Sequence, residues 1–167
     1  MSNPVTATIP HTAVRRLTLS ALVMAVFIAV MYLTQSFAFG QYQIRLATAL
    51  YSLSALFPFL VLPLGISNLV SNMLMGGLGL PDMVGGFAVG LTTSGLAYGV
   101  RRLGLPDWCL AMPVIFCPGL LVPLWLSPLI QVPYGWLAVS ITIGQIVPGI
   151  LGIVLVRQLR GKIDWQQ

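Results

Sequence analysis

Hydrophobic residues along this chain run in long, unbroken stretches and do not alternate with polar ones. Four long stretches contain no Asp, Glu, Lys or Arg: residues 17–44, 46–81, 83–100 and 108–156. A transmembrane helix needs about 20 apolar residues, so the first and third stretches hold one span each, and the second and fourth hold two. The pattern predicts an all-α integral membrane protein with six transmembrane helices. A β-barrel is not favoured, because barrel strands alternate apolar and polar residues over about 10 positions.

The breaks between the stretches place the spans along the chain. We expect the first two at residues 19–39 and 45–60, followed by a turn near Pro58 and Pro63 into a third span that ends near Met75. A glycine-rich loop then leads to the fourth span, which ends at Val100. The fifth begins near Trp108, and the sixth covers residues 134–156. A single six-helix domain over residues 17–157, with tails at 1–16 and 158–167, follows from these positions.

Prolines recur every five residues through the fifth span and the loop after it: Pro113, Pro118, Pro123, Pro128 and Pro133. A proline inside a helix removes one backbone hydrogen bond and kinks the helix. We therefore expect the fifth span to be bent or broken.

The composition agrees with a chain surrounded by lipid. Charged residues make up 7% of the sequence and hydrophobic residues 57%, whereas charged residues are about 25% of an ordinary soluble domain. The mean hydropathy is +0.95. A soluble fold of this length would have too few charges to cover its surface.

The few basic residues indicate the topology. Arg15 and Arg16 precede the first span, Arg101 and Arg102 follow the fourth, and three more follow the sixth: Arg157, Arg160 and Lys162. With six spans these sites lie on one side of the membrane, and short cytoplasmic loops collect Lys and Arg. Both termini are therefore expected in the cytoplasm. Arg45 is the exception and lies on the outer side. Nucleic acid is not an expected partner, because the basic residues are scattered as pairs between apolar spans.

Polar residues within or beside the spans mark a candidate binding site, because such residues are costly in lipid. They gather in the outer half of the membrane: Gln43, Arg45, Thr48, Asn68, Asn72, Asp82 and, near the middle of the sixth span, Gln145. Ser52 would continue a stripe down one helix face from Arg45 and Thr48, at spacings of three and four. Together these residues predict a pocket that is open to the outside and lined mainly by neutral hydrogen-bonding groups.

Several of these residues also have a structural interpretation. Arg45 and Asp82 either contact a ligand or pair with one another. Asp82 is also well placed to be the N-cap of the fourth span. Asn68 and Asn72 are four residues apart, and their amides could instead join two helices by hydrogen bonds. The convergence of several polar groups at one depth favours a pocket.

The residues needed for catalysis or for a metal site do not stand out. The single histidine, His11, lies in the N-terminal tail, and no carboxylate pair or Cys–His pair falls within the spans. Metal ligation and acid–base chemistry depend on such groups. No glycine-rich loop with Lys is present to bind nucleotide phosphates. We therefore expect no enzyme activity, no cofactor and no metal, and a binding protein that takes its energy from a partner fits better.

Three small residues in the first span suggest a helix-packing surface. Ala21, Ala25 and Ala29 recur every four residues, a spacing that permits two helix backbones to approach closely. The partner could be another protein or another helix of the same bundle. Packing within the bundle is favoured by this pattern alone, because Gly86 with Gly90, and Gly95 with Gly99, have similar spacing.

Together these features resemble the substrate-binding (S) components of energy-coupling-factor (ECF) transporters. More specifically, residues 40–86 are similar to the QueT family, which is thought to import queuosine precursors. The family's motif at the start of span two corresponds to Gln43, Ile44, Arg45, Leu46, Ala47, Thr48, Ala49 and Leu50. Further matches are Asn72, Gly79, Asp82 and Gly86, and a Gly-Glu pair of span six corresponds to Gly144 and Gln145.

The resemblance carries expectations about partners and mechanism. It implies a small nucleobase-like or vitamin-like ligand captured from outside the cell membrane. It also implies a transmembrane coupling (T) subunit that binds the Ala21, Ala25 and Ala29 surface, and two ABC ATPase subunits that power reorientation and uptake.

The chain departs from the family at two acidic positions, which are Thr48 and Gln145 here. If the family's two carboxylates contact an amine, this chain is expected to prefer a neutral ligand. A standalone permease or channel, and a membrane assembly protein without a small-molecule ligand, remain alternatives.

Overall fold

The computed structural model describes residues 11–38, 43–76 and 78–161. Of the residues discussed above, Gly40 and Lys162 lie outside this range, as do residues 1–10 of the N-terminal tail and 162–167 of the C-terminal tail. The described part is helical and contains no β-strand. The predicted all-α class is therefore confirmed.

In the described part of the chain, five helical segments are long and apolar enough to cross a membrane: Thr12–Leu33, Pro58–Gly76, Leu80–Arg102, Asp107–Ile130 and Tyr134–Arg160. The first is most of α1 (His11–Leu33), which begins inside the predicted tail and is followed by the short α2 (Gln35–Ala38). The second is built from the 3₁₀ turn η2 (Pro58–Leu60), α3 (Val61–Ser71) and the π-helical turn η3 (Asn72–Gly76). The third is α4 (Leu80–Arg102).

The last two segments pack against each other. The 3₁₀ turn η4 (Asp107–Leu110) leads into α5 (Ala111–Ile130), and α6 (Tyr134–Gly144) continues into α7 (Ile146–Arg160). α5 is one continuous α-helix although it contains Pro118, Pro123 and Pro128. The fifth span is therefore not broken. A break is found instead in the sixth predicted span, at Gln145 between α6 and α7.

The segment predicted as the second span is the ten-residue 3₁₀-helix η1 (Leu46–Ala55). At about 2.0 Å per residue, a 3₁₀-helix of this length extends about 20 Å, against about 15 Å for an α-helix. η1 is apolar but shorter than a full span, so the count of six spans stays a prediction. Eight of its ten residues are buried, because η1 packs against α7, α4 and α1 in the middle of the bundle.

The predicted polar stripe falls at η1, a 3₁₀-helix with 3.0 residues per turn. Thr48 and Ser52 both face the α6–α7 segment: Thr48 Oγ1 donates to Gln145 Oε1, and a Cβ added to Gly152 would collide with Ser52 Oγ. That Arg45 shares one stripe with Thr48 and Ser52 stays a prediction.

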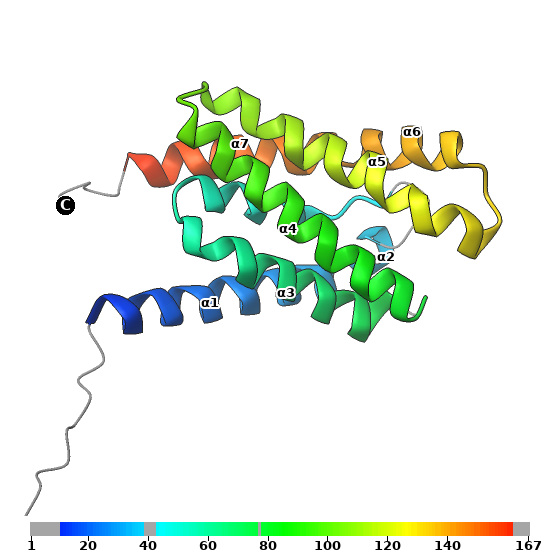
Figure 1. Cartoon of the computed structure of the whole chain (residues 1–167), viewed down its shortest axis with the longest axis horizontal. Coiled ribbons are helices and arrows are strands. Elements are labelled where there is room, and N and C mark those ends of the chain that lie inside the picture. The colour runs from blue at the N-terminus through cyan, green and yellow to red at the C-terminus, as the bar shows by residue number, and fades with distance from the viewer. Residues whose placement is uncertain (1–10, 39–42, 77, 162–167) are drawn as a thin grey trace, which may run out of the picture.

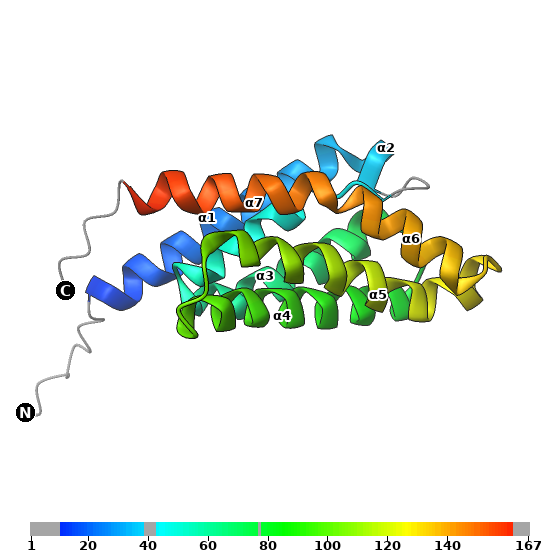
Figure 2. The ribbon, with the colours of Figure 1, turned by 90° about the horizontal axis from the view of Figure 1, so that it is seen from above.

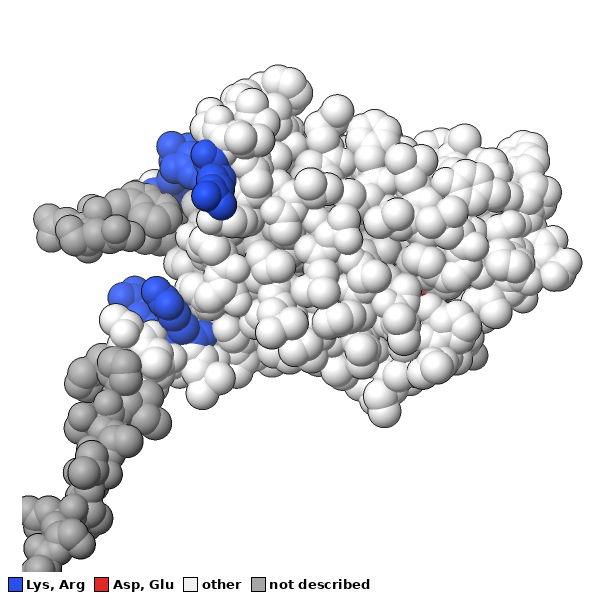
Figure 3. Space-filling model, in the orientation of Figure 1, with Lys and Arg blue, Asp and Glu red and all other residues white. Residues whose placement is uncertain are grey.

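The helices lie roughly along the long axis of the molecule (Figures 1 and 2). The start of α1, the end of α4 and the end of α7 lie at one end, which we call the inner end. α2, the start of α4 and the α5–α6 turn lie toward the opposite, outer end. The arginine side chains visible in Figure 3 gather at the inner end. This agrees with the arginine distribution predicted from six spans, and which membrane side this end faces stays a prediction.

The surface between the two ends is apolar. Large hydrophobic side chains are exposed along every long helix, including Leu33 at 80% and Trp136 at 76%. An apolar surface of this extent is stable only where lipid covers it. The chain is therefore a multi-pass membrane protein.

α3 and α4 form the most extensive helix pair, and glycines allow their close approach. A Cβ added to Gly90 would lie 2.9 Å from the Cα of Gly65, and one added to Gly86 would collide with the Asn72 side chain. The packing interpretation of Gly86 and Gly90 is confirmed. It is wrong for Gly95 and Gly99, because a Cβ at either position would have no atom within 4 Å.

Candidate functional site

Arg45 lies at the centre of a buried polar cluster near the outer end. It is the residue immediately before η1, and 4% of it is exposed. Its Nη1 donates to Oδ1 of Asn72 at 3.2 Å and to Oδ1 of Asn68 at 3.4 Å, and its Nε donates to the carbonyl of Ala38 at 3.4 Å. A buried guanidinium needs acceptors of this kind, because desolvating a charge without them is very costly.

The two asparagines connect the guanidinium to α4. Asn68 Nδ2 donates to the carbonyl of Gly86 at 2.8 Å, and Asn72 Nδ2 donates to the carbonyl of Asp82 at 2.9 Å. Each amide therefore turns its oxygen toward Arg45 and its nitrogen toward the α4 backbone. The two interpretations given above are compatible, because these side chains join α3 to α4 and also build the polar cluster.

Gln145 connects the other side of the cluster to the break between α6 and α7. Its side chain is fully buried, its Oε1 accepts from Thr48 Oγ1 at 2.7 Å, and its Nε2 donates to the carbonyl of Gln43 at 2.9 Å. Thr48 Oγ1 also lies 2.6 Å from the carbonyl of Arg45, and its single hydrogen serves one acceptor at a time. The break at Gln145 has a local cause, because Pro148 has no N–H to donate to the carbonyl of Gly144.

Asp82 approaches the cluster from the first turn of α4 and is 2% exposed. It is not the N-cap of that helix, which is Gly79 with a φ of 80°. A carboxylate in the first turn still interacts favourably with the helix dipole. Asn72 lies between the two charged residues, since it accepts from Arg45 and donates to the Asp82 carbonyl.

Trp125 of α5 joins the site and was not predicted from the sequence. Its Nε1 donates to Oδ1 of Asp82 at 3.2 Å. The indole lies directly against α4, because a Cβ added to Gly85 would be 2.5–2.7 Å from its ring atoms. The available signals were an indole N–H that needs an acceptor and the absence of a side chain at Gly85, but no spacing in the sequence links the two helices.

The structure therefore brings all seven predicted residues into one hydrogen-bonded cluster, which we call the outer cluster: Gln43, Arg45, Thr48, Asn68, Asn72, Asp82 and Gln145. Each of them is at most 8% exposed. In the described structure these side chains pack against one another, and the pocket open to the outside stays a prediction.

Two atoms of the outer cluster are buried acceptors that receive no hydrogen bond within the described part of the chain: Gln43 Oε1 and Asp82 Oδ2. An unsatisfied buried polar atom costs about 1–3 kcal/mol, and more when it is charged. Such an atom in a native protein needs an explanation. Donors supplied by a bound molecule would satisfy these two acceptors.

The surface formed by Ala21, Ala25 and Ala29 is exposed. α1 packs into the bundle through a different face, which carries Val23, Phe27 and Met31. The interpretation that these alanines pack against another helix of the same bundle is therefore wrong. Ala25 and Ala29 instead line an open groove of about 640 Å³, together with residues of α1, α2 and η3: Ile28, Tyr32, Gln35, Leu74 and Met75.

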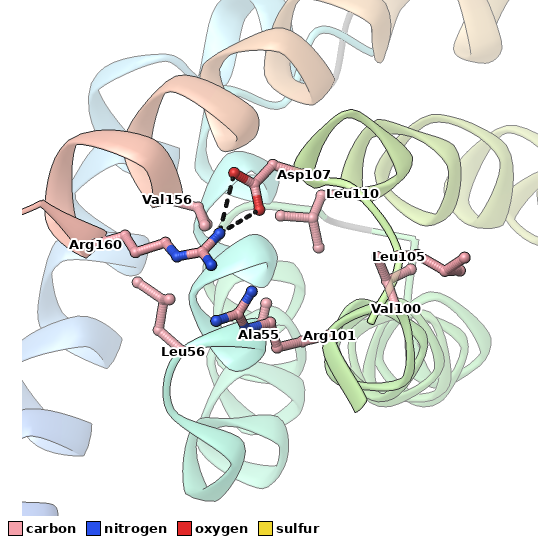
Figure 4. A pocket seen from close by; sticks show the side chains of 9 residues that line it. All are labelled: Ala55, Leu56, Val100, Arg101, Leu105, Asp107, Leu110, Val156 and Arg160. Carbon is pink, nitrogen blue, oxygen red and sulfur yellow. Dashed lines mark hydrogen bonds and ion pairs between the residues drawn. The ribbon is translucent and has the colours of Figure 1, made fainter. Parts of the chain in front are cut away.

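A second charged group lies at the inner end (Figure 4). Arg160 Nη1 is 3.2 Å from Oδ1 and 3.5 Å from Oδ2 of Asp107, and Arg157 Nε is 3.8 Å from Oδ2. We call these three residues the inner cluster. The depression beside it, which Arg101 also lines, leaves no room for a water molecule. This cluster ties η4 to the end of α7.

Within the described residues, no three His, Cys, Asp or Glu side chains are grouped so that they could hold a metal ion. The chemistry of the outer cluster is therefore that of hydrogen bonding between one cation, one carboxylate, neutral amides and an indole.

An apolar multi-span bundle with a buried polar centre on its outer side is the architecture of a membrane protein that handles a small polar molecule. A family model described as QueT transporter matches residues 17–161. The chain belongs to the QueT transporter family and is a membrane transporter protein. Searches of the curated proteins and of the solved structures gave no match.

Proposed function

We propose that this chain is the substrate-binding (S) component of an ECF importer in the cell membrane. It captures a queuosine precursor, a 7-deazaguanine, from outside the cell at the outer cluster. Uptake is then driven by ATP hydrolysis in partner subunits. Membership of the QueT transporter family supports the transport role. The observation that carries the site is the convergence of seven buried polar residues from four separate segments in one network.

The Thr48–Gln145 pair supports a neutral ligand. These two residues stand where the resemblance places the family's two acidic residues, and their side chains are hydrogen-bonded to each other at 2.7 Å. The two positions at which this chain departs from the family therefore lie in contact with each other. With no carboxylate there, a ligand ammonium would lose its countercharge, which is strongly unfavourable in a buried site.

Calorimetric titration of the purified protein in lipid nanodiscs tests this proposal. The neutral 7-cyano-7-deazaguanine is expected to bind at least about 10-fold more tightly than the cationic 7-aminomethyl form, as an unpaired buried charge requires. Gln145→Glu, which restores a carboxylate, is expected to shift the preference toward the amine. Strong selective binding of the amine by the unmodified protein would refute the neutral-ligand proposal, and absence of binding by both compounds would refute the substrate class.

The exposed alanine surface supports a coupling partner. Ala21, Ala25 and Ala29 face outward beside an apolar groove, and small residues of this spacing permit close helix approach. We propose that the transmembrane coupling (T) subunit, which joins the two ABC ATPase subunits, packs here.

Ala25→Leu is expected to leave ligand affinity within about 2-fold of the unmodified protein, because Ala25 is exposed on the outward face of α1 and is not part of the outer cluster. It is expected to reduce copurification with the T subunit and ATP-dependent uptake by about 10-fold or more. Ala88→Leu is the matched control, since Ala88 is exposed on α4 away from this groove. Unchanged uptake by Ala25→Leu would remove the alanine surface from the proposal. Transport into liposomes that lack the ATPases would instead indicate a standalone permease.

A further inference from the structure

The outer cluster contains buried acceptors that no protein donor reaches. Donor nitrogens in and beside the cluster already bond protein acceptors: the two asparagine amides bond α4 carbonyls, Gln145 Nε2 bonds the carbonyl of Gln43, and Trp125 Nε1 bonds Asp82 Oδ1. Within the outer cluster, the buried atoms that lack a hydrogen-bond partner among the residues described are the acceptors Asp82 Oδ2 and Gln43 Oε1. A molecule that satisfies them has to present N–H or O–H groups.

From this imbalance we infer that Asp82 is the residue that determines specificity for the ligand's base, by accepting hydrogen bonds from its N–H edge. The inference rests on the proposed function, because it takes the base to be a 7-deazaguanine. That ring is neutral and carries its N1–H and its 2-amino group side by side on one edge. Two parallel donors of this kind match the two oxygens of a carboxylate.

The geometry around Asp82 suits this role. Oδ2 is buried and receives no bond in the described structure, while Oδ1 receives one bond, from Trp125 at 3.2 Å, and keeps a second lone pair. The site already contains one cation, Arg45, which donates to the side-chain amides of Asn68 and Asn72. A neutral base therefore adds no net charge to a site that holds one guanidinium and one carboxylate.

Trp125 is a positioning residue in this arrangement. Its N–H holds Oδ1, and Gly85 leaves the space that lets its ring lie against the first turns of α4. The carboxylate is thereby prevented from rotating freely, so that Oδ2 keeps one direction. Preorganisation of this kind lowers the entropic cost of binding.

The experiment compares two ligands that differ only in the 2-amino group: 7-cyano-7-deazaguanine and its 2-deamino analogue, 7-cyano-7-deazahypoxanthine. The unmodified protein in nanodiscs is expected to bind the first about 10–100-fold more tightly, because the analogue leaves a charged acceptor unpaired. Asp82→Asn, which turns an N–H₂ or a neutral oxygen toward the ligand, is expected to reduce that preference to within about 3-fold. Asp107→Asn, at the inner end, is the matched control and is expected to keep the full preference.

Trp125→Phe provides an independent test if Asp82→Asn does not fold. It keeps an aromatic ring and removes the N–H, and the preference is expected to fall by about 3–10-fold. An unchanged preference in a folded Asp82→Asn or Trp125→Phe protein would overturn the assignment while leaving the proposed function in place. Failure of the unmodified protein to bind either compound would overturn both. If Asp82 had a purely structural role, Asp82→Asn would lower the affinity for both ligands equally. That outcome would also contradict the assignment.

Discussion

The bundle holds one carboxylate with arginine at each end, and the two groups differ in almost every physical respect. In the outer cluster, Asp82 and Arg45 are 2% and 4% exposed, and Asn72 contacts both. In the inner cluster, Asp107 contacts Arg160 and Arg157 directly, and the arginine side chains are 42% and 60% exposed. The same residue types therefore form a buried network at one end and a solvated ion pair at the other.

The difference shows what each group contributes. Charges in contact with water attract each other weakly, and such pairs contribute about 0–1 kcal/mol. Buried charges depend on every neighbour that satisfies them, so that removing one partner is costly. The outer cluster therefore carries specificity, whereas the inner cluster anchors η4 to the end of α7 with little energy at stake.

The largest effect is expected from Arg45→Met. Methionine fills a similar length but cannot donate to Asn68, Asn72 or the Ala38 carbonyl, and it leaves Asp82 without a nearby cation. Removal of one member of a buried charged network costs about 3–5 kcal/mol. Thermal unfolding in detergent should show a clear fall in melting temperature, with loss of ligand binding. Arg157→Met, in the inner cluster, is the matched control, and equal melting temperatures for the two variants would contradict the comparison.

A smaller effect is expected where the α3–α4 contact supports the outer cluster. In Gly90→Ala the new Cβ would lie 2.9 Å from the Cα of Gly65 and 3.3 Å from the carbonyl of Leu64. Both are backbone atoms, so the helices have to separate, at a cost of about 1–3 kcal/mol.

The control lies on the same helix. Gly95→Ala adds its methyl group where nothing lies within 4 Å. Its melting temperature should be unchanged or slightly raised, since Ala is favoured over Gly in a helix by about 1 kcal/mol. If Gly90→Ala melts at the same temperature as Gly95→Ala, the close approach of α3 and α4 does not limit stability.

The smallest effect is expected from Asp107→Asn. It removes the charge from the 3.2 Å and 3.8 Å contacts with Arg160 and Arg157. An exposed pair of this kind contributes less than about 1 kcal/mol, and salt screens it. The difference in melting temperature from the unmodified protein should be small at low salt and should vanish in about 1 M NaCl, where the Debye length is about 3 Å. A large difference that persists in salt would show that the inner cluster is a buried network after all.

The sequence by itself determined the class of protein. Uncharged stretches long enough to span a bilayer predict membrane helices, because every backbone group in lipid needs an internal partner. The positions of the polar residues also predicted the members of the outer cluster, from Gln43 to Gln145, since polar side chains in lipid are tolerated only where they meet one another or a ligand. The family resemblance rested on the same residues, and the family is confirmed.

Only the tertiary structure decided how those residues meet. Hydrophobic periodicity does not distinguish the 3₁₀-helix η1 from an α-helix, so the helix type of this segment came from the structure alone. Whether the alanines of α1 pack inward or outward depends on which face α3 covers, and Val23 and Phe27 take that face. The contact of Trp125 with Asp82 joins α5 to α4 across 43 residues. No local pattern encodes such a pairing, because it depends on how the packed helices are placed relative to one another.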